Sequence, residues 1–231
     1  MADSWTFDEL THAGPEHLDP DYVAGYDRKS GIDPVDDVAA LGSLGMTPTC
    51  TVVDIGAGTG RFTLAIAPHC GRVVAVDVSA PMLASLAVAA RDAGHDNVEI
   101  VQAGFLSYQH QGSAADVVYS RNALHHLPDF WKALALERIS RMVRPGGILR
   151  LRDLIYDFEP GEADTAVEAW IGGGTVDPAL GWTQDELAEH VRTEHSTFRW
   201  LLEPMLDRAG FDMVDVSFRR RVYGSYTCIR L

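Results

Sequence analysis

Three glycines and two aspartates surround one short turn of the sequence. Gly56, Gly58 and Gly60 directly follow a β-branched run; Asp54 lies within that run, and Asp77 ends the next apolar run. In such a turn Gly56 permits the tight bend, Gly58 lets a ligand approach the backbone, and Gly60 allows close helix–strand packing. A carboxylate at the position of Asp77 can accept hydrogen bonds from both hydroxyls of an unphosphorylated ribose. The pattern therefore predicts a nucleoside-binding turn.

The spacing of these glycines also indicates which kind of nucleoside binds. The dinucleotide fingerprint is G-x-G-x-x-G, with a pyrophosphate over the helix N-terminus. Here the third glycine comes one residue earlier, and Arg61 follows it. The carboxylate of Asp54 suits a ligand that carries an ammonium and a sulfonium group, and it would repel a pyrophosphate. A nicotinamide-dependent oxidoreductase is therefore disfavoured, although it stays an alternative.

Alternating strands and helices must position this turn. Strands are predicted at 51–55, 72–78, 98–103, 115–120 and 148–154, with helices at about 60–68, 80–92 and 129–142. Strands that are apolar nearly throughout are typical of parallel sheets covered on both faces. Further helices are predicted at 183–193 and 197–209, followed by two strands spaced as an antiparallel hairpin, 212–219 and 224–231. This order predicts a doubly wound α/β fold.

The domain organisation follows from the segments that break this alternation. Residues 1–45 are predicted to form a helical extension that packs on the domain as a lid, and residues 46–231 form the binding domain. Residues 155–182 are rich in glycine and show no sustained period, which predicts a long excursion on the substrate side. Within the helix 129–142, Phe130 and Trp131 are assigned to the core-facing stripe.

Four segments resemble, in register, the motifs of class I S-adenosylmethionine-dependent methyltransferases. They are VVDIGAGTGRFTLAIA (52–67), VVAVDVSAPML (73–83), ADVVYSRNALHHLPD (115–129) and MVRPGGILRLRD (142–153). The most similar branch methylates small molecules, including quinone precursors. The resemblance implies a Rossmann-like seven-stranded sheet, mostly parallel with an antiparallel last strand. It also implies S-adenosylmethionine as cofactor, S-adenosylhomocysteine as product, and methyl transfer to a small-molecule acceptor by in-line displacement.

The resemblance assigns the cofactor contacts residue by residue. It places Met82 against the adenine, and Arg121 could meet the cofactor carboxylate. One departure is Gly104, which stands where the family has an acidic residue that binds the adenine amino group, so that the backbone near Phe105 would take over. The full set of expected cofactor contacts is Asp54, Gly56, Ala57, Gly58, Asp77, Val78, Met82, Gly104, Phe105 and Arg121.

A base is needed only if the acceptor atom loses a proton during methyl transfer. His125 follows the fourth strand, where the methyl group should emerge, and is the expected catalytic base; with His126 it could instead pack the loop. Trp170 and Trp182 flank the glycine-rich excursion and could wall an aromatic acceptor. Because the acid at position 104 is missing, a non-enzymatic S-adenosylmethionine-binding protein is the main alternative.

Composition limits the partners. The 231 residues carry 19 basic and 33 acidic side chains, a net charge of −14, which disfavours nucleic-acid binding. Three cysteines without a C-x-x-C pair, and scattered histidines, predict neither a disulfide framework nor a metal site. No apolar run approaches the roughly 18 residues of a membrane span, and the N-terminus does not resemble a secretory signal. These features predict a cytoplasmic protein, and they say nothing of its oligomeric state.

Overall fold

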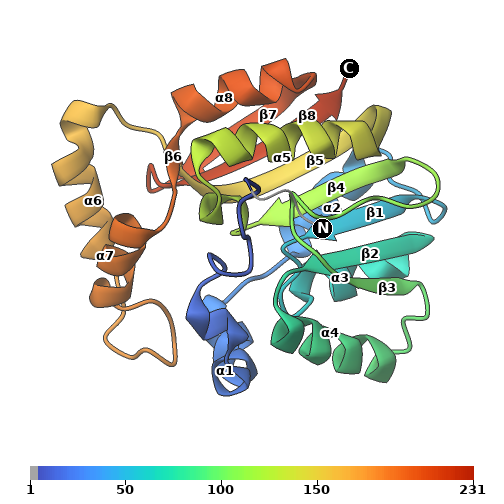
Figure 1. Cartoon of the computed structure of the whole chain (residues 1–231), viewed down its shortest axis with the longest axis horizontal. Coiled ribbons are helices and arrows are strands. Elements are labelled where there is room, and N and C mark those ends of the chain that lie inside the picture. Colours follow the sequence, from blue (N-terminus) through green and yellow to red (C-terminus); the bar gives the residue numbers. More distant parts are fainter. Residues whose placement is uncertain (1–4) are drawn as a thin grey trace.

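The computed structural model describes residues 5–231, which are built around one sheet (Figure 1). Seven strands lie in the order β3-β2-β1-β4-β5-β8-β7, and a two-residue strand, β6, pairs with β5 off this path. The strands β1 to β5 pair in parallel, whereas β8 is antiparallel to β5 and β7, so the predicted fold class is confirmed. The strands are β1 (Thr51–Ile55), β2 (Arg72–Asp77), β3 (Val98–Gln102), β4 (Ala115–Arg121), β5 (Val143–Tyr156), β6 (Thr197–Phe198), β7 (Phe211–Arg219) and β8 (Tyr223–Arg230).

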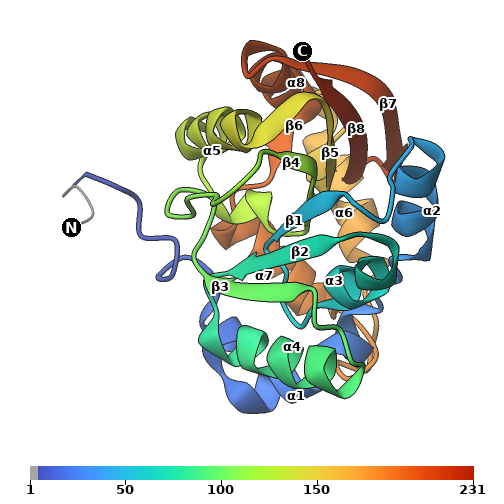
Figure 2. The same ribbon diagram turned by 90° about the vertical axis from the view of Figure 1, so that its right-hand side faces the viewer.

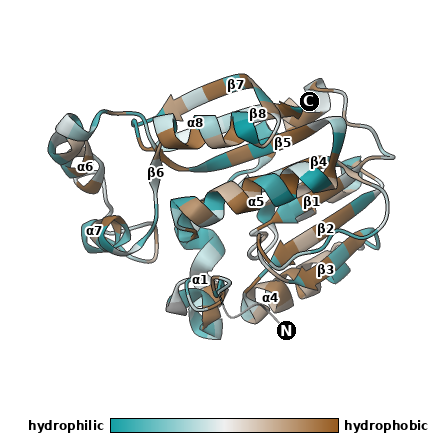
Figure 3. Cartoon of the chain, turned by 45° about the horizontal axis from the view of Figure 1, so that its top comes forward, coloured by the Kyte–Doolittle hydropathy of each residue, from teal (hydrophilic) through white to brown (hydrophobic). Residues whose placement is uncertain are grey.

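Helices cover both faces of the sheet, with α5 on one side and α2 and α3 on the other (Figure 2). The central strands are mostly hydrophobic, as their brown colour in Figure 3 shows. Because successive strand residues point to opposite faces, Val53 joins the core under α5 and α8, and Val52 joins the core under α2 and α3. The helices are α1 (Pro20–Ser30), α2 (Val35–Ser43), α3 (Arg61–Ile66), α4 (Ala80–Asp92), α5 (Asp129–Met142), α6 (Ala163–Ile171), α7 (Gln184–Thr193) and α8 (Arg199–Arg208), with 3₁₀ turns η1 (Pro15–Leu18), η2 (Ala67–His69), η3 (Leu124–His126) and η4 (Pro160–Glu162).

Two predicted helices begin at side-chain caps. Ser79 precedes α4, and its side chain accepts a hydrogen bond from the backbone N–H of Met82 at 3.2 Å. Thr183 precedes α7 and forms a capping box with Glu186. Both caps satisfy backbone N–H groups that have no partner inside the helix, which explains why these two boundaries could be predicted.

The assignment of Phe130 to the core is wrong. Its side chain is 63% exposed, whereas Lys132 lies within the buried face of α5 at 2% exposure. The Lys132 ammonium donates hydrogen bonds to Asp129, at 2.9 Å, and to the carbonyl of His195. A lysine can be buried here because its charge is hydrogen-bonded, and no apolarity pattern reveals such a partner in advance.

Two predicted segments contain more structure than expected. Residues 155–182 were expected to lack a regular element, but they hold α6, which lies to the left of the sheet in Figure 1 together with α7. The helix has nine residues, too few for its period to be clear in the sequence. The strand β5 begins at Val143, five residues before the predicted strand, and its register against β4 shifts between Ala115 and Val117. A bulge of this kind allows proline and glycine inside a strand.

The N-terminal extension is helical, as predicted. It contains η1, α1 and α2, and residues 1–4 lie outside the described part of the chain. The helix α1 lies against α4 at the lower edge of the sheet (Figures 1 and 2). Over residues 5–231, no helix is both long and apolar enough to cross a bilayer.

Candidate active site

The glycine turn between β1 and α3 has the conformation that its sequence predicts. Gly56, Gly58 and Gly60 have φ angles of 76°, 55° and 89°, which strain any residue with a side chain. A Cβ atom on Gly56 would lie 2.3 Å from the Cβ of Ala123, and one on Gly60 would lie 2.5 Å from Cγ of Leu86. A Cβ on Gly58 would meet nothing within 4 Å. The first and third glycines therefore allow close packing, and the second leaves backbone open to a ligand.

All ten predicted cofactor contacts line one cavity at the carboxyl ends of β1, β2 and β4. They meet there because parallel strands end at the same edge of a sheet. The apolar part of the wall includes Met82 and Phe105, which are 3% and 5% exposed. Arg121 reaches the same cavity, but its Nη1 lies 3.5 Å from Oδ2 of Asp37 and donates to the carbonyl of Asp33 at 3.1 Å. Its guanidinium is thus already engaged by the N-terminal extension.

Two carboxylates beside the glycine turn line this cavity, Asp54 buried and Asp77 half-buried. Asp77 accepts hydrogen bonds from the backbone N–H groups of Gly58 and Ser79, each at 2.8 Å, while burial raises its pKa. Asp54 is 2% exposed and accepts one from Thr63 at 2.6 Å. Burial raises the pKa of Asp54 to about 7. A cationic ligand would stabilise the ionised form of either group, whereas an anionic ligand would be repelled.

The pKa of Asp54 predicts a specific pH dependence of stability. Its folded-state pKa of about 7 is above the ordinary value of 3.8, so folding favours the protonated form. This contribution is complete below pH 4 and is lost as the pH rises through 7. Wild type should therefore lose stability from pH 5 to pH 7, at about 1.4 kcal/mol per pH unit. Asp54→Asn should not, so its stability relative to wild type should rise by about 2–3 kcal/mol over this range. Urea unfolding of both proteins at the two pH values measures the change.

The matched control for that measurement is Asp96→Asn, because Asp96 is an exposed carboxylate away from the cavity. Its stability relative to wild type should not change between the two pH values. A constant difference between Asp54→Asn and wild type would show that Asp54 is ionised at both pH values.

A second, larger cavity adjoins the first. It has a volume of about 520 Å³, and aromatic side chains from the N-terminal extension and the excursion line it, among them Trp170 and Trp182. We call it the acceptor cavity, and the first the cofactor cavity, after the ligands that the sequence resemblance leads us to expect there. Four residues line both: His17, Tyr26, Asn122 and His126. The two cavities therefore meet, and the N-terminal extension forms part of the junction.

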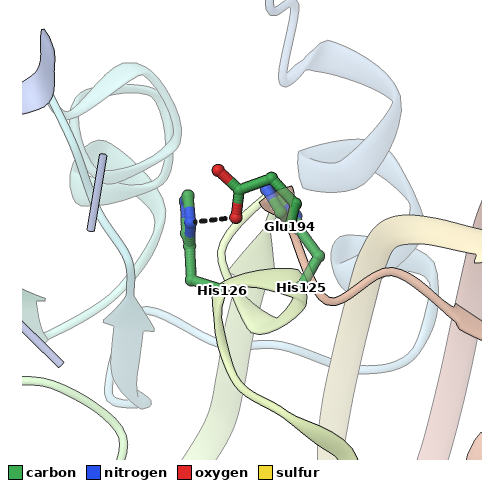
Figure 4. A group of neighbouring side chains, drawn as sticks. All are labelled: His125, His126 and Glu194. Atoms are coloured by element: carbon green, nitrogen blue, oxygen red, sulfur yellow. Dashed lines mark hydrogen bonds and ion pairs between the residues drawn. The ribbon is translucent and has the colours of Figure 1, made fainter. Parts of the chain in front are cut away.

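The histidines after β4 form two histidine–carboxylate pairs, of which Figure 4 shows that of His126 and Glu194. Nδ1 of His125 donates to Oδ1 of the buried Asp153 at 2.5 Å, and Nδ1 of His126 pairs with Oε2 of Glu194 at 2.9 Å. Burial acts to raise the pKa of Asp153, but the His125 ring lowers it to about 2. Likewise, burial would lower the pKa of His126, but the hydrogen bond to Glu194 raises it. His125 lines the acceptor cavity and not the cofactor cavity.

These side chains also form a potential metal-binding group that the sequence does not indicate. The ligand atoms of His125, His126 and Glu194 lie within 4.8 Å of one another. The group comes from a loop after β4 and the end of α7, so no local spacing could reveal it. Each histidine already has a carboxylate partner, and that arrangement is also what orients a general base.

The sequence predicts that the N-terminal extension packs on the domain as a lid, but it does not show which residues before α1 line the site. Glu9, Ala13 and His17 line the cofactor cavity, although they lie far from the glycine turn in the sequence. The segment is held on α5, where Trp5 stacks on Trp131 with ring centroids 5.7 Å apart. No periodicity marks this segment, so only its packing shows that it belongs to the site.

Comparison with known proteins finds relatives that are described as methyltransferases. Residues 52–147 match a family model described as a methyltransferase domain. The chain is 30% identical to an uncharacterized methyltransferase, YcgJ, of Bacillus subtilis over 109 residues, which cover 47% of this chain and 42% of the relative. An uncharacterized methyltransferase of Geobacillus kaustophilus is 26% identical over 191 residues, 83% of this chain and 77% of that protein. The chain thus spans half or less of the length of YcgJ and of a second relative, YafE of Escherichia coli, at 42% and 50%.

A solved structure shares the fold across the whole chain. Magnesium protoporphyrin IX methyltransferase (ChlM) from Synechocystis, with bound SAM, superposes with a TM-score of 0.66. The match covers 99% of this chain and 100% of the other at 16% sequence identity.

Proposed function

We propose that the chain, which matches a methyltransferase domain over residues 52–147, is a class I S-adenosylmethionine-dependent methyltransferase. From this premise we propose that it methylates a small, uncharged or cationic molecule bound in the acceptor cavity. The observation that carries the proposal is the junction of the two cavities at His17, Tyr26, Asn122 and His126. A donor in one cavity and an acceptor in the other would meet there, and most of the catalysis of methyl transfer comes from such positioning.

The residues of the cofactor cavity suit S-adenosylmethionine, which supplies a methyl group activated by a positive sulfur. Gly58 leaves the backbone open, and Asp77 lines the cavity, where its carboxylate would accept hydrogen bonds from the ribose hydroxyls. The carboxylates of Asp54 and Asp77, whose pKa values are raised by burial, favour a ligand with positive charge. The same carboxylates argue against the dinucleotide of an oxidoreductase.

The lining of the acceptor cavity supports an acceptor that is uncharged or cationic. Acidic side chains line it, among them Glu16, Glu189 and Glu194, and its described lining includes neither lysine nor arginine. An acidic acceptor would therefore be repelled. Two polar atoms in its wall, Nε2 of His17 and the Tyr22 hydroxyl, are buried without a hydrogen-bond partner among the described residues. A buried polar atom without a partner is costly, so we propose that the acceptor carries polar groups that satisfy them.

We further propose that His125 removes a proton from the acceptor atom. Asp153 accepts the Nδ1–H of His125, which leaves Nε2 as the proton acceptor, and the ring lies in the wall of the acceptor cavity. The buried Asp153 also accepts hydrogen bonds from the backbone of Leu124 and Leu154, each at 2.7 Å. These bonds fix the carboxylate and so fix the direction of the imidazole.

The experiment is a calorimetric titration of the protein with S-adenosylhomocysteine, S-adenosylmethionine and NADH. We expect both sulfur compounds to bind, NADH not to bind, and Asp77→Ala to weaken the binding of the sulfur compounds about 100-fold, because two charge-assisted hydrogen bonds are lost. A panel of aromatic alcohols, amines and carboxylates, assayed with radiolabelled methyl donor, then tests the acceptor class. Asp96→Ala, which removes an exposed carboxylate, is the control for Asp77→Ala. Binding without turnover over the panel would favour a non-enzymatic binding protein, and absence of binding would overturn the proposal.

A further inference from the structure

We infer that Glu9, from the N-terminal segment, binds the purine amino group of the cofactor and so selects adenine at this site. The inference rests on the proposed function, because it concerns the same cofactor cavity. It adds a residue that lies outside the domain formed by the strands and helices from β1 onward.

A purine bound in the cofactor cavity would lie beside Gly104. Asp77 ends β2 and pairs in parallel register with Gln102 of β3, so the chain just after β3 lies beside the ribose position. Gly104 follows there, and it lines the cavity with Met82 and Phe105. The two apolar side chains form surfaces against which a flat base can pack. A ribose at Asp77 therefore directs the base toward Gly104.

The carboxylate of Glu9 fills the space beside Gly104. A Cβ atom built on Gly104 would lie 2.4 Å from Oε1 of Glu9, 2.5 Å from its Cδ and 2.6 Å from its Oε2. The Glu9 carboxylate thus takes the volume in which a side chain at position 104 would begin. Glycine at this position is explained by the close approach of Glu9, since a larger residue would displace it.

The two carboxylate oxygens of Glu9 differ in their hydrogen bonds. Oε2 accepts hydrogen bonds from the backbone N–H of Leu106, at 3.0 Å, and from the Ser107 hydroxyl, at 3.3 Å. Oε1 forms no hydrogen bond of ordinary geometry within residues 5–231. The backbone N–H groups of Phe105 and Ser107 also lie near the carboxylate and lower the pKa of Glu9, against the larger effect of burial, which raises it. One oxygen therefore anchors the carboxylate, while the other remains available in a cavity that Glu9 lines. An amino group is the hydrogen-bond donor of adenine that matches such an acceptor.

The test measures purine discrimination as well as affinity. The probes are S-adenosylhomocysteine and its 6-oxo analogue, S-inosylhomocysteine, which presents a carbonyl where adenine has an amino group. Wild type should prefer the adenine compound, and Glu9→Ala should bind it about tenfold more weakly and lose the preference, because a hydrogen bond to a charged group is lost. Glu9→Gln, whose amide can donate to a carbonyl, should shift the preference toward the 6-oxo compound. Asp36→Asn removes an exposed charge from the same extension and serves as control.

Moving the carboxylate from position 9 to position 104 distinguishes loss of adenine recognition from loss of structure. Gly104→Asp in the Glu9→Ala background should restore part of the adenine preference, because it places a carboxylate in the same space. In the wild-type background, Gly104→Asp should weaken binding, since its side chain collides with Glu9.

Equal affinities of wild type and Glu9→Ala would overturn the inference and leave the proposed function intact. Tighter binding by Glu9→Ala would also overturn it, because Glu9 would then compete with the purine. Failure of wild type to bind either probe would instead contradict the proposed function.

Discussion

Asp37→Ala is expected to lower the free energy of unfolding by about 3–5 kcal/mol, the range for removing one partner of a buried ion pair. Asp37 lies on α2 and is fully buried. Its carboxylate accepts hydrogen bonds from Arg150 at 3.0 Å, Arg152 at 2.7 Å and the Tyr119 hydroxyl at 2.9 Å, and Arg121 lies 3.5 Å away. Removing it would leave three guanidinium groups of β4 and β5 close together without their shared anion.

Thermal unfolding measures this loss, which corresponds to a decrease of roughly 10 °C in Tm for a domain of this size. Asp36→Ala is the matched control, because Asp36 is the preceding residue of α2 and is exposed. It should change stability by less than about 0.5 kcal/mol. An Asp37→Ala protein as stable as the control would mean that the arginines find other partners when α2 is altered. In that case Asp37 would not be the residue that holds the extension to the sheet.

His125→Ala is expected to reduce the rate of methyl transfer by about 10²–10⁴-fold, the usual contribution of a general base. The affinity for S-adenosylhomocysteine should remain close to that of wild type, because His125 lines the acceptor cavity and not the cofactor cavity. The measurement uses the acceptor identified in the panel, with kcat and KM determined for both proteins.

The control for this prediction is His69→Ala, since His69 is an exposed histidine at the end of η2. It should have wild-type kinetics. A His125→Ala enzyme with a wild-type rate would exclude His125 as the base. A change in KM alone would assign His125 to acceptor binding.

Much of the cofactor cavity could be predicted from local patterns. The apolar runs predicted the five parallel strands, and the glycines predicted the turn after β1. Since parallel strands end at one edge, residues at their carboxyl ends must converge there, and Asp54, Asp77 and Arg121 do line one cavity. The same reasoning placed His125 at that edge, but it could not tell which cavity the ring lines.

The sequence by itself determined the sheet, the glycine turn and the residues that this turn brings together, because strand period, helix capping and glycine conformation are local properties of the chain. Only the tertiary structure decided which distant side chains complete the site. Glu9 beside Gly104, Asp153 beside His125 and Asp37 among the arginines are all contacts between segments far apart in the sequence. Such contacts depend on how the elements pack, and no periodicity along the chain encodes them. For the same reason the exposed Phe130 and the buried Lys132 could be assigned only after α5 was placed against its neighbours.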